Sequence, residues 1–195
     1  MKMPLILMLT ALLAAPALAG LDPATDSFGV YFDLEGNTNC TTASMGQVVN
    51  AYLLLLNPAG PTDGFECSIA LTGAQHVVLS TVFANGCNLD IDWEPAPGDL
   101  IGACPASYPV PESGAVLLVS WVFMMQSSSE LMFHLGPASI PSLPGGLPVV
   151  TGNGILRRWA LSSGSPSLPV AGINAGNCPV SEETSAFGAV KGLFR

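Results

Sequence analysis

The stretch from Gln47 to Leu71 constrains the fold most, because it reads as two strands joined by a turn. Residues 48–56 are apolar on both faces toward their end, which is typical of a strand inside a sheet with cover on both sides. Proline and glycine then mark a turn over residues 57–64. The second strand has a core face and a water face, as a period of two predicts; Phe65, Cys67, Ile69 and Leu71 share the core face, and Glu66, Ser68 and Ala70 share the water face.

Similar short patterns recur along the chain, separated by glycine, proline and polar turns. Residues 115–125 form a second strand that is apolar on both faces, so both it and 48–56 are expected in sheet interiors. Residues 75–83 read as a strand with Val77, Leu79, Thr81 and Phe83 on one side. In all, about ten strands are expected, and they predict an all-β fold, a two-sheet antiparallel β-sandwich over residues 20–178.

The N-terminus has the pattern of a cleavable signal peptide over residues 1–19. Lys2 gives a positive start, residues 5–13 are apolar, and Ala17-Leu18-Ala19 has the small-x-small form of a cleavage site. A span of about 20 apolar residues is needed to cross a bilayer, and no later segment reaches it. We therefore expect a secreted, periplasmic or cell-surface protein without a membrane span after cleavage.

Charge argues against one class of partner. No Lys or Arg occurs between Leu21 and Leu156, whereas twelve carboxylates do, and the whole chain has a net charge of -9. Such a surface repels phosphate backbones, so nucleic-acid binding is not expected.

Five cysteines in an exported chain predict two disulfides and one thiol. Cys87 and Cys104 are nearly equidistant from the turn at 94–98, and Cys40 and Cys178 lie near the two ends of the expected domain. These placements favour the pairs Cys40–Cys178 and Cys87–Cys104. Cys67, on an apolar strand face, is expected to be free and buried.

One candidate metal site stands out. Asp90, Asp92 and Glu94 alternate with apolar residues, so their carboxylates share a strand face and could bind Ca²⁺. The alternative is a solvated strand face, because Ca²⁺ takes about 6–8 oxygens. No other cofactor is expected.

Candidates for catalysis are few. His76 and His134 are the only histidines and neither has a motif around it, and Ser120 lies within an apolar strand with no Gly-x-Ser-x-Gly elbow. We therefore expect a non-enzyme. For stacking on a sugar, Trp93 and Trp121 are expected in the core, which leaves Tyr108 and Trp159 as the expected exposed rings.

The strand pattern resembles that of cohesin modules, the jelly-roll sandwiches of cellulosome scaffolds and related carbohydrate-binding proteins. The resemblance rests on residues 51–56, 64–69 and 116–123 and covers roughly residues 29–135. It implies a jelly-roll module that binds through a surface. In addition, the frame of residues 29–33, 169–174 and 191–195 is similar to a set of uncharacterised exported bacterial proteins.

These observations lead to an exported, non-catalytic binding or structural module that engages a protein or glycan surface. The alternatives are a carbohydrate-binding module and a secreted hydrolase of unrecognised type. The polar residues 181–185 lack apolar side chains to bury, so residues 179–195 are expected to form a flexible tail.

Overall fold

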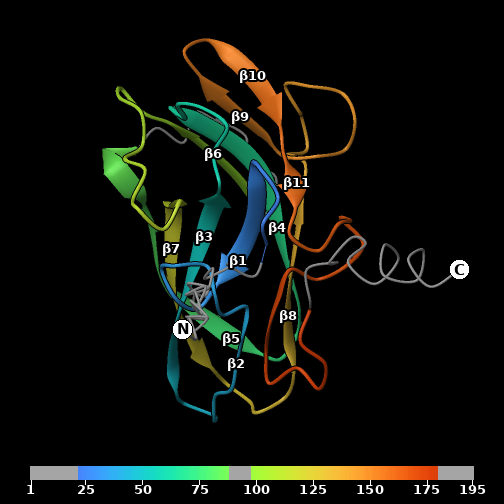
Figure 1. The fold of residues 1–195 in the computed structure, drawn as a ribbon. Coiled ribbons are helices and arrows are strands. Elements are labelled where there is room, and N and C mark those ends of the chain that lie inside the picture. The colour runs from blue at the N-terminus through green and yellow to red at the C-terminus, as the bar shows by residue number, and fades with distance from the viewer. Residues whose placement is uncertain (1–21, 88–97, 180–195) are drawn as a thin grey trace, which may run out of the picture.

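The computed structural model describes residues 22–87 and 98–179, and these are all-β apart from one turn of 3₁₀ helix (Figure 1). Twelve strands follow one another along the described chain. They are β1 (Ser27–Tyr31), β2 (Cys40–Thr41), β3 (Val48–Leu56), β4 (Gly64–Gly73), β5 (His76–Phe83), β6 (Asp99–Ala103), β7 (Ala115–Met125), β8 (Leu131–Gly136), β9 (Val149–Gly152), β10 (Ile155–Arg158), β11 (Ala160–Leu161) and β12 (Ala171–Ile173); the 3₁₀ turn η1 (Ala84–Gly86) follows β5.

The strands form two sheets. Sheet A has the order β11-β1-β3-β7-β5, and sheet B has the order β10-β9-β4-β8-β12-β2, with β6 paired to β4. The two-sheet sandwich is therefore confirmed. So are the interior positions of β3 and β7, each of which is hydrogen-bonded on both sides.

Three details differ from the expectation. There are more strands than about ten, because β2 is only two residues long, β9 lies in a stretch rich in glycine and proline, and residues 155–161, which read as one strand in the sequence, are divided into β10 and β11. Two pairs are parallel, β1 with β11 and β12 with β2, whereas the other pairs are antiparallel. In β5 the register shifts between Val78 and Ser80, so a bulge at Leu79 breaks the single face expected for Val77 and Thr81.

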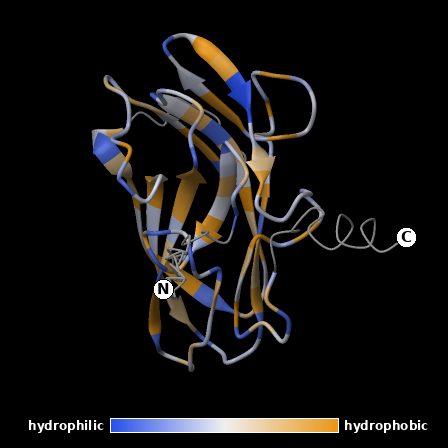
Figure 2. Ribbon diagram, in the orientation of Figure 1, coloured by the Kyte–Doolittle hydropathy of each residue, from blue (hydrophilic) through white to orange (hydrophobic). Residues whose placement is uncertain are grey.

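The core lies between the sheets and contains side chains from both. Phe123 of sheet A and Phe133 of sheet B meet edge to face with ring centroids 5.5 Å apart, in the range that aromatic pairs prefer. The hydropathy colouring shows the apolar character of β3 and β7 along most of their length (Figure 2). A second, smaller cluster of Tyr31, Leu54, Leu56 and Ala115 lies on the other side of sheet A.

The chain passes from sheet B to sheet A directly after β4, where Gly73 ends the strand with a φ of +104°. A Cβ at this position would meet the backbone of Glu130. The N–H of the next residue, Ala74, donates to the Glu130 carbonyl at 2.7 Å, so the crossing is tightly held.

Two disulfides tie the described chain. Cys40 is joined to Cys178 with the Cα atoms 5.7 Å apart, and Cys87 is joined to Cys104 with the Cα atoms 4.6 Å apart. Cys67 carries a free thiol and is fully buried.

The expected signal peptide lies outside the described residues, and so does the expected tail apart from Pro179. Where the structure describes the chain, it contains no helix of the length and apolar character that crossing a membrane requires.

Candidate functional site

The outer face of sheet A, turned away from sheet B, carries no charged side chain on β3, β7 or β5. Residues paired directly across neighbouring strands point to the same side of a sheet, so the register groups the face into rows. From one end of the sheet to the other, the rows are Val48–Met124–Val77, Asn50–Val122–Ser80, Tyr52–Ser120–Val82, Leu54–Leu117 and Leu56–Ala115.

The two ends of this face differ in cover. Leu54, Leu56 and Ala115 are buried, with Tyr31 packed beside them. At the other end the exposed fraction of the side chains is 50% for Val48, 36% for Val77 and 54% for Val82. The doubly apolar pattern toward the end of β3 is therefore confirmed, since Leu54 and Leu56 are covered on the outer face, whereas Val48, which precedes that pattern, is exposed.

Strand β5 extends the apolar surface to the edge of the sheet. It pairs with β7 on one side and is the last strand of sheet A in the described chain. Val78 and Leu79, at its bulge, are 45% and 51% exposed. An exposed apolar edge is a common place for another surface to dock.

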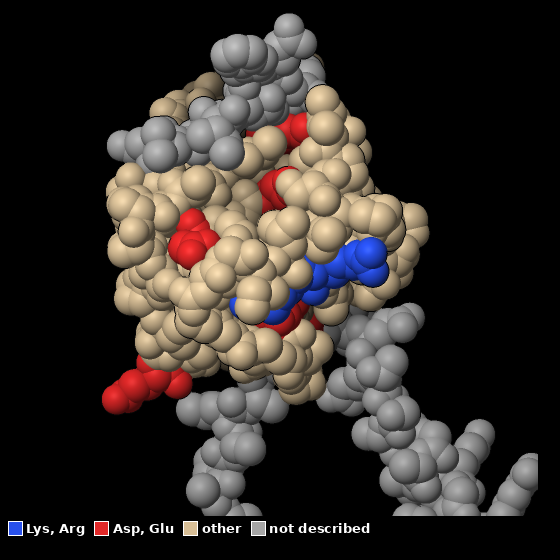
Figure 3. Space-filling view, turned by 90° about the horizontal axis from the view of Figure 1, so that it is seen from above, with Lys and Arg blue, Asp and Glu red and all other residues tan. Residues whose placement is uncertain are grey.

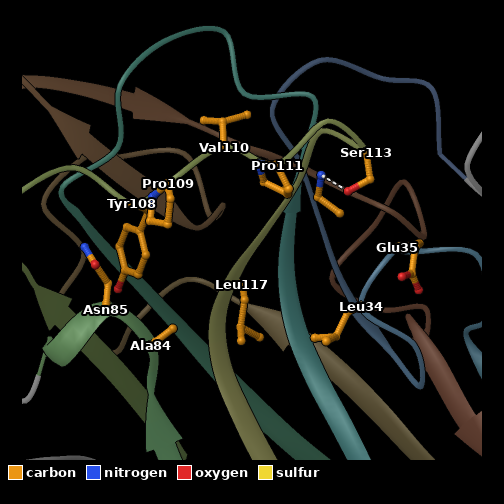
Figure 4. A pocket seen from close by; sticks show the side chains of 11 residues that line it. Leu34, Glu35, Ala84, Asn85, Tyr108, Pro109, Val110, Pro111, Ser113 and Leu117 are labelled. Carbon is orange, nitrogen blue, oxygen red and sulfur yellow. Dashed lines mark hydrogen bonds between the residues drawn. The ribbon is translucent and has the colours of Figure 1, made fainter.

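A cavity of about 520 Å³ opens at the covered end of the face (Figure 4). Its wall includes Ala115 and Leu117 of β7, and three separate loops supply the rest. Aliphatic and proline side chains predominate, and Glu35 is the only charged residue among those that line it. The other lining residues are Leu34, Ala84, Asn85, Tyr108, Pro109, Val110, Pro111 and Ser113.

Tyr108 lines this wall, and its hydroxyl is buried. Only 3% of the residue is exposed, and its hydroxyl has no hydrogen-bond partner among the described residues. Burial raises the pKa of Tyr108 above the ordinary tyrosine value. The hydroxyl lies next to the Asn85 side chain (Figure 4). Asn85 has a φ of 56°, and its amide donates to the carbonyls of Ala106 and Ser107 at 3.3 and 3.4 Å.

Both rims of the cavity are held in place. On one side Asp33 Oδ1 accepts hydrogen bonds from the N–H groups of Glu35 and Asn37, each at 3.0 Å, which fixes the loop that carries Leu34 and Glu35. On the other side the Cys87–Cys104 disulfide joins the segment after Asn85 to the segment before Tyr108. The cavity is thus preorganised by covalent and hydrogen-bonded restraints.

The predicted calcium ligands Asp90, Asp92 and Glu94 lie outside the described residues, so the metal site stays a prediction. Within residues 22–87 and 98–179, no three His, Cys, Asp or Glu side chains gather as a metal site would require.

The structure does not bring the two histidines together. His76 begins β5 of sheet A and its Nδ1 lies 2.9 Å from the Ala74 carbonyl. His134 is on β8 of sheet B, with Nε2 at 3.4 Å from the Thr72 hydroxyl. Ser120 is half-buried on the outer face of sheet A.

The expectation that Tyr108 and Trp159 are exposed rings is wrong. Trp159 is 1% exposed because it follows β10 into the core and packs on Phe28, with ring centroids 4.5 Å apart. Tyr108 is covered in the cavity wall and packs on Phe65 at a centroid distance of 6.5 Å. Trp121 is 4% exposed, as a core position predicts, and Trp93 lies outside the described residues. No tryptophan in the described part of the chain can stack flat on a sugar.

Glu66 is also buried, although its strand face was expected to meet water. The loop between β8 and β9 folds over it, and the Ser142 N–H and hydroxyl donate to its carboxylate at 2.6 and 2.7 Å. This cover comes from a segment of glycine and proline, which shows no periodicity in the sequence.

Basic charge is confined to one place on the described chain. Arg157 and Arg158 of β10 are its only Lys or Arg residues, and they form the blue patch of Figure 3. Arg157 Nε lies 3.4 Å from Asp26 Oδ2, and the guanidinium reaches the Pro61 carbonyl at 3.2 Å. Arg157 therefore holds the turn before β4 against the start of β1 and acts as a structural clamp.

Sequence reasoning missed the outer face of sheet A and the cavity. The signal for the face was present, since Ser120, Val122 and Met124 alternate with core residues without any charge. The cavity gave no signal, because its walls come from segments that are far apart in sequence.

Comparisons with known proteins give a likeness in fold. No family model and no curated protein matches the sequence. Twelve chains of solved structures match.

A type II cohesin domain from the cellulosome of Acetivibrio cellulolyticus is 19% identical, with a TM-score of 0.47 over 77% of this chain and 96% of that one. The second type II cohesin module from the adaptor ScaA scaffoldin of the same organism is 12% identical, with a TM-score of 0.48 over 82% and 94%. A cohesin module from a family 33 glycoside hydrolase of Clostridium perfringens is 12% identical, with a TM-score of 0.42 over 68% and 89%. The likeness is distant, and the function below rests on this chain's own residues.

Proposed function

We propose that this protein is an exported, non-catalytic module that binds another protein against the outer face of sheet A. The observation that carries the proposal is the set of cross-strand rows without charge, two of which include valines that are 36–54% exposed. A contiguous exposed apolar face of this kind marks an interaction site.

The chemistry of the face defines the partner. Valine, methionine and tyrosine side chains dominate it, so a complementary surface is apolar and uncharged where it touches the β3–β7–β5 rows. Burying a charge there without a counter-charge would be costly. The acidic surface elsewhere on the module would favour basic groups around the edge of the contact.

Export is supported by the signal-peptide pattern of residues 1–19 and by the two disulfides, which persist in oxidising compartments. A glycan as ligand receives no support from the described tryptophans, because Trp121 and Trp159 are buried.

The test compares two lysine substitutions at equally exposed apolar sites. Val82→Lys lies on the outer face of sheet A, whereas Leu168→Lys lies in the loop before β12, where the residue is 46% exposed. A partner is first captured from the exported fraction of the source cells and purified, and its Kd is then measured by calorimetry. Sedimentation of the protein alone establishes whether a second copy is that partner.

We expect Val82→Lys to weaken binding at least about tenfold, because the ammonium group would be desolvated in the interface without a partner charge. Leu168→Lys should leave the Kd unchanged. A partner whose affinity survives Val82→Lys, or falls equally with both variants, would overturn the assignment of the face.

A further inference from the structure

We propose that the cavity beside the outer face of sheet A binds a small amphiphile, whose apolar body fills the aliphatic chamber and whose positively charged head pairs with Glu35. The proposal concerns a second site and does not depend on the protein-docking function proposed above.

The size of the cavity favours a small molecule. Its volume is about 520 Å³, within the range of roughly 300–1,000 Å³ for small-molecule sites. A cavity of about 150 Å³ accepts benzene, so this chamber has room for about three groups of that size. One inserted side chain from a partner would leave most of the space unfilled. A ligand of about 10–20 non-hydrogen atoms fits better on this scale.

The walls define the body of the ligand. Leu34, Ala84, Val110, Leu117 and the two prolines 109 and 111 present only carbon to the chamber through their side chains. Such walls make no hydrogen bonds with a sugar, and they favour an alkyl or aryl group because they remove its apolar surface from water.

One polar side chain at the rim orients the ligand. Glu35 is held there by the Asp33 turn. Tyr108 also lines the wall, but its hydroxyl is buried away from solvent and so from the open cavity.

The charge of the head follows from the charges around it. Among the described residues that line the cavity, Glu35 is the only charged one and none is Lys or Arg, and the whole chain carries a net charge of -9. A carboxylate or sulfate head would be repelled and an ammonium head attracted. Because Glu35 is exposed, the attraction is that of a surface pair, about a factor of two to five in affinity.

The experiment uses three ligands that share one alkyl chain and differ in head charge: octylammonium and octanoate, each below its micelle concentration, and 1-octanol below its solubility limit. Binding is followed by amide chemical shifts of the ¹⁵N-labelled protein at Ala84 and Leu117. We expect octylammonium to bind about threefold more tightly than octanol and about tenfold more tightly than octanoate, with added salt reducing the difference.

Two kinds of variant test separately the contact of Glu35 with the charged head and the binding of the alkyl chain in the cavity. Glu35→Gln should remove the preference for octylammonium while octanol binding stays, and Glu112→Gln, an exposed acid that does not line the cavity, should leave the preference intact. Ala84→Phe should abolish binding of all three ligands. Val110→Trp, at an exposed rim position, serves the same purpose if Ala84→Phe does not fold.

The proposal is overturned if none of the three ligands shifts these amides, if octanoate binds most tightly, or if both filling variants leave the affinities unchanged. Loss of protein docking by Val82→Lys with ligand binding retained would show that the two sites are separate.

Discussion

At the scale of single residues, the free thiol is the most protected reactive group of the described chain. Cys67 is fully buried, and burial, followed by the nearby Asp99 and Glu66 carboxylates, raises its pKa. Because the thiolate is the reactive form, native protein at pH 8 should not react with a disulfide reagent such as DTNB. In denaturant, one thiol per chain should react. Rapid reaction of the native protein would contradict this burial.

Three buried side chains that can lose a proton at high pH make the stability of the protein change with pH in the alkaline range. The pKa values of Cys67, Tyr31 and Tyr108 are raised, chiefly by burial, so the folded chain keeps protons that the unfolded chain loses at ordinary values. Above roughly pH 9 the unfolded state binds fewer protons, and the stability should fall as the pH rises. Melting temperatures between pH 8 and 11 measure the slope.

Tyr108→Phe should make that slope shallower and leave the stability at pH 7 unchanged or raised by up to about 1 kcal/mol, because the lost hydroxyl has no partner in the described chain. A flat pH profile of the unsubstituted protein would exclude the mechanism. A large loss of stability in the variant at pH 7 would show that the hydroxyl is bonded.

Residue-scale predictions from sequence succeed where alternation decides the outcome. Phe65 and Cys67 are buried because their strand has a clear inward face. Other residues are buried because a loop folds over them or because they follow the end of a strand into the core; these are Tyr108, Trp159 and Glu66. The alternation of apolar and polar residues along a strand does not predict this kind of burial.

At the scale of elements, the glycine that ends β4 controls the passage between sheets. Gly73→Ala should destabilise the protein by about 2–3 kcal/mol, because alanine would be strained at a φ of +104° and its Cβ would meet the Glu130 backbone. Gly86→Ala is the matched control: its φ is +68°, but a Cβ there meets nothing within 4 Å, so about 1 kcal/mol is expected. Chemical denaturation measures both. If both variants lose the same free energy of unfolding, the strain of the positive φ accounts for the whole loss at Gly73 and the contact with Glu130 adds nothing.

Elements with apolar residues on both faces are predictable, and elements that depend on distant partners are not. β3 and β7 lie inside sheet A as expected. β2 exists only because β12 lies beside it, so its two-residue sequence holds no signal. β9 lies within residues 136–154, which glycine and proline mark as coil with at most short strands, and it forms a hairpin with β10. Residues 155–161 read as a strand in the sequence, but the change of partner from β9 to β1 that divides them into β10 and β11 has no signal there.

At the scale of the whole molecule, the long-range disulfide should contribute more stability than the short-range one. The sequence separations are 138 for Cys40–Cys178 and 17 for Cys87–Cys104. The chain-entropy model gives about 5 and about 3 kcal/mol, respectively. Replacing each pair by serine and comparing denaturation midpoints tests this order. Non-reducing peptide mapping tests the pairs themselves, and a disulfide that contains Cys67 would contradict them.

The sandwich could be predicted from the sequence, but its open half could not. Doubly apolar strands indicate that something covers both sides, and they do not say whether the cover comes from the same chain. Here the chain covers Leu54 and Leu56 and leaves Val48 and Val82 exposed. The binding hypothesis depends on that difference, which only the arrangement of strands and loops reveals.

The alternation of the chain between the sheets determines when each sheet can be completed. β1 receives its outer neighbour only when residues 160–161 arrive, and β2 pairs only with residues 172–173. A chain that emerges N-terminus first therefore exposes unpaired strand edges until nearly its whole length is free. Such non-local pairing makes folding slow, in milliseconds to seconds, and the emerging chain is vulnerable to aggregation during that time. During synthesis, this molecule would depend on holding chaperones more than a fold built from local hairpins does.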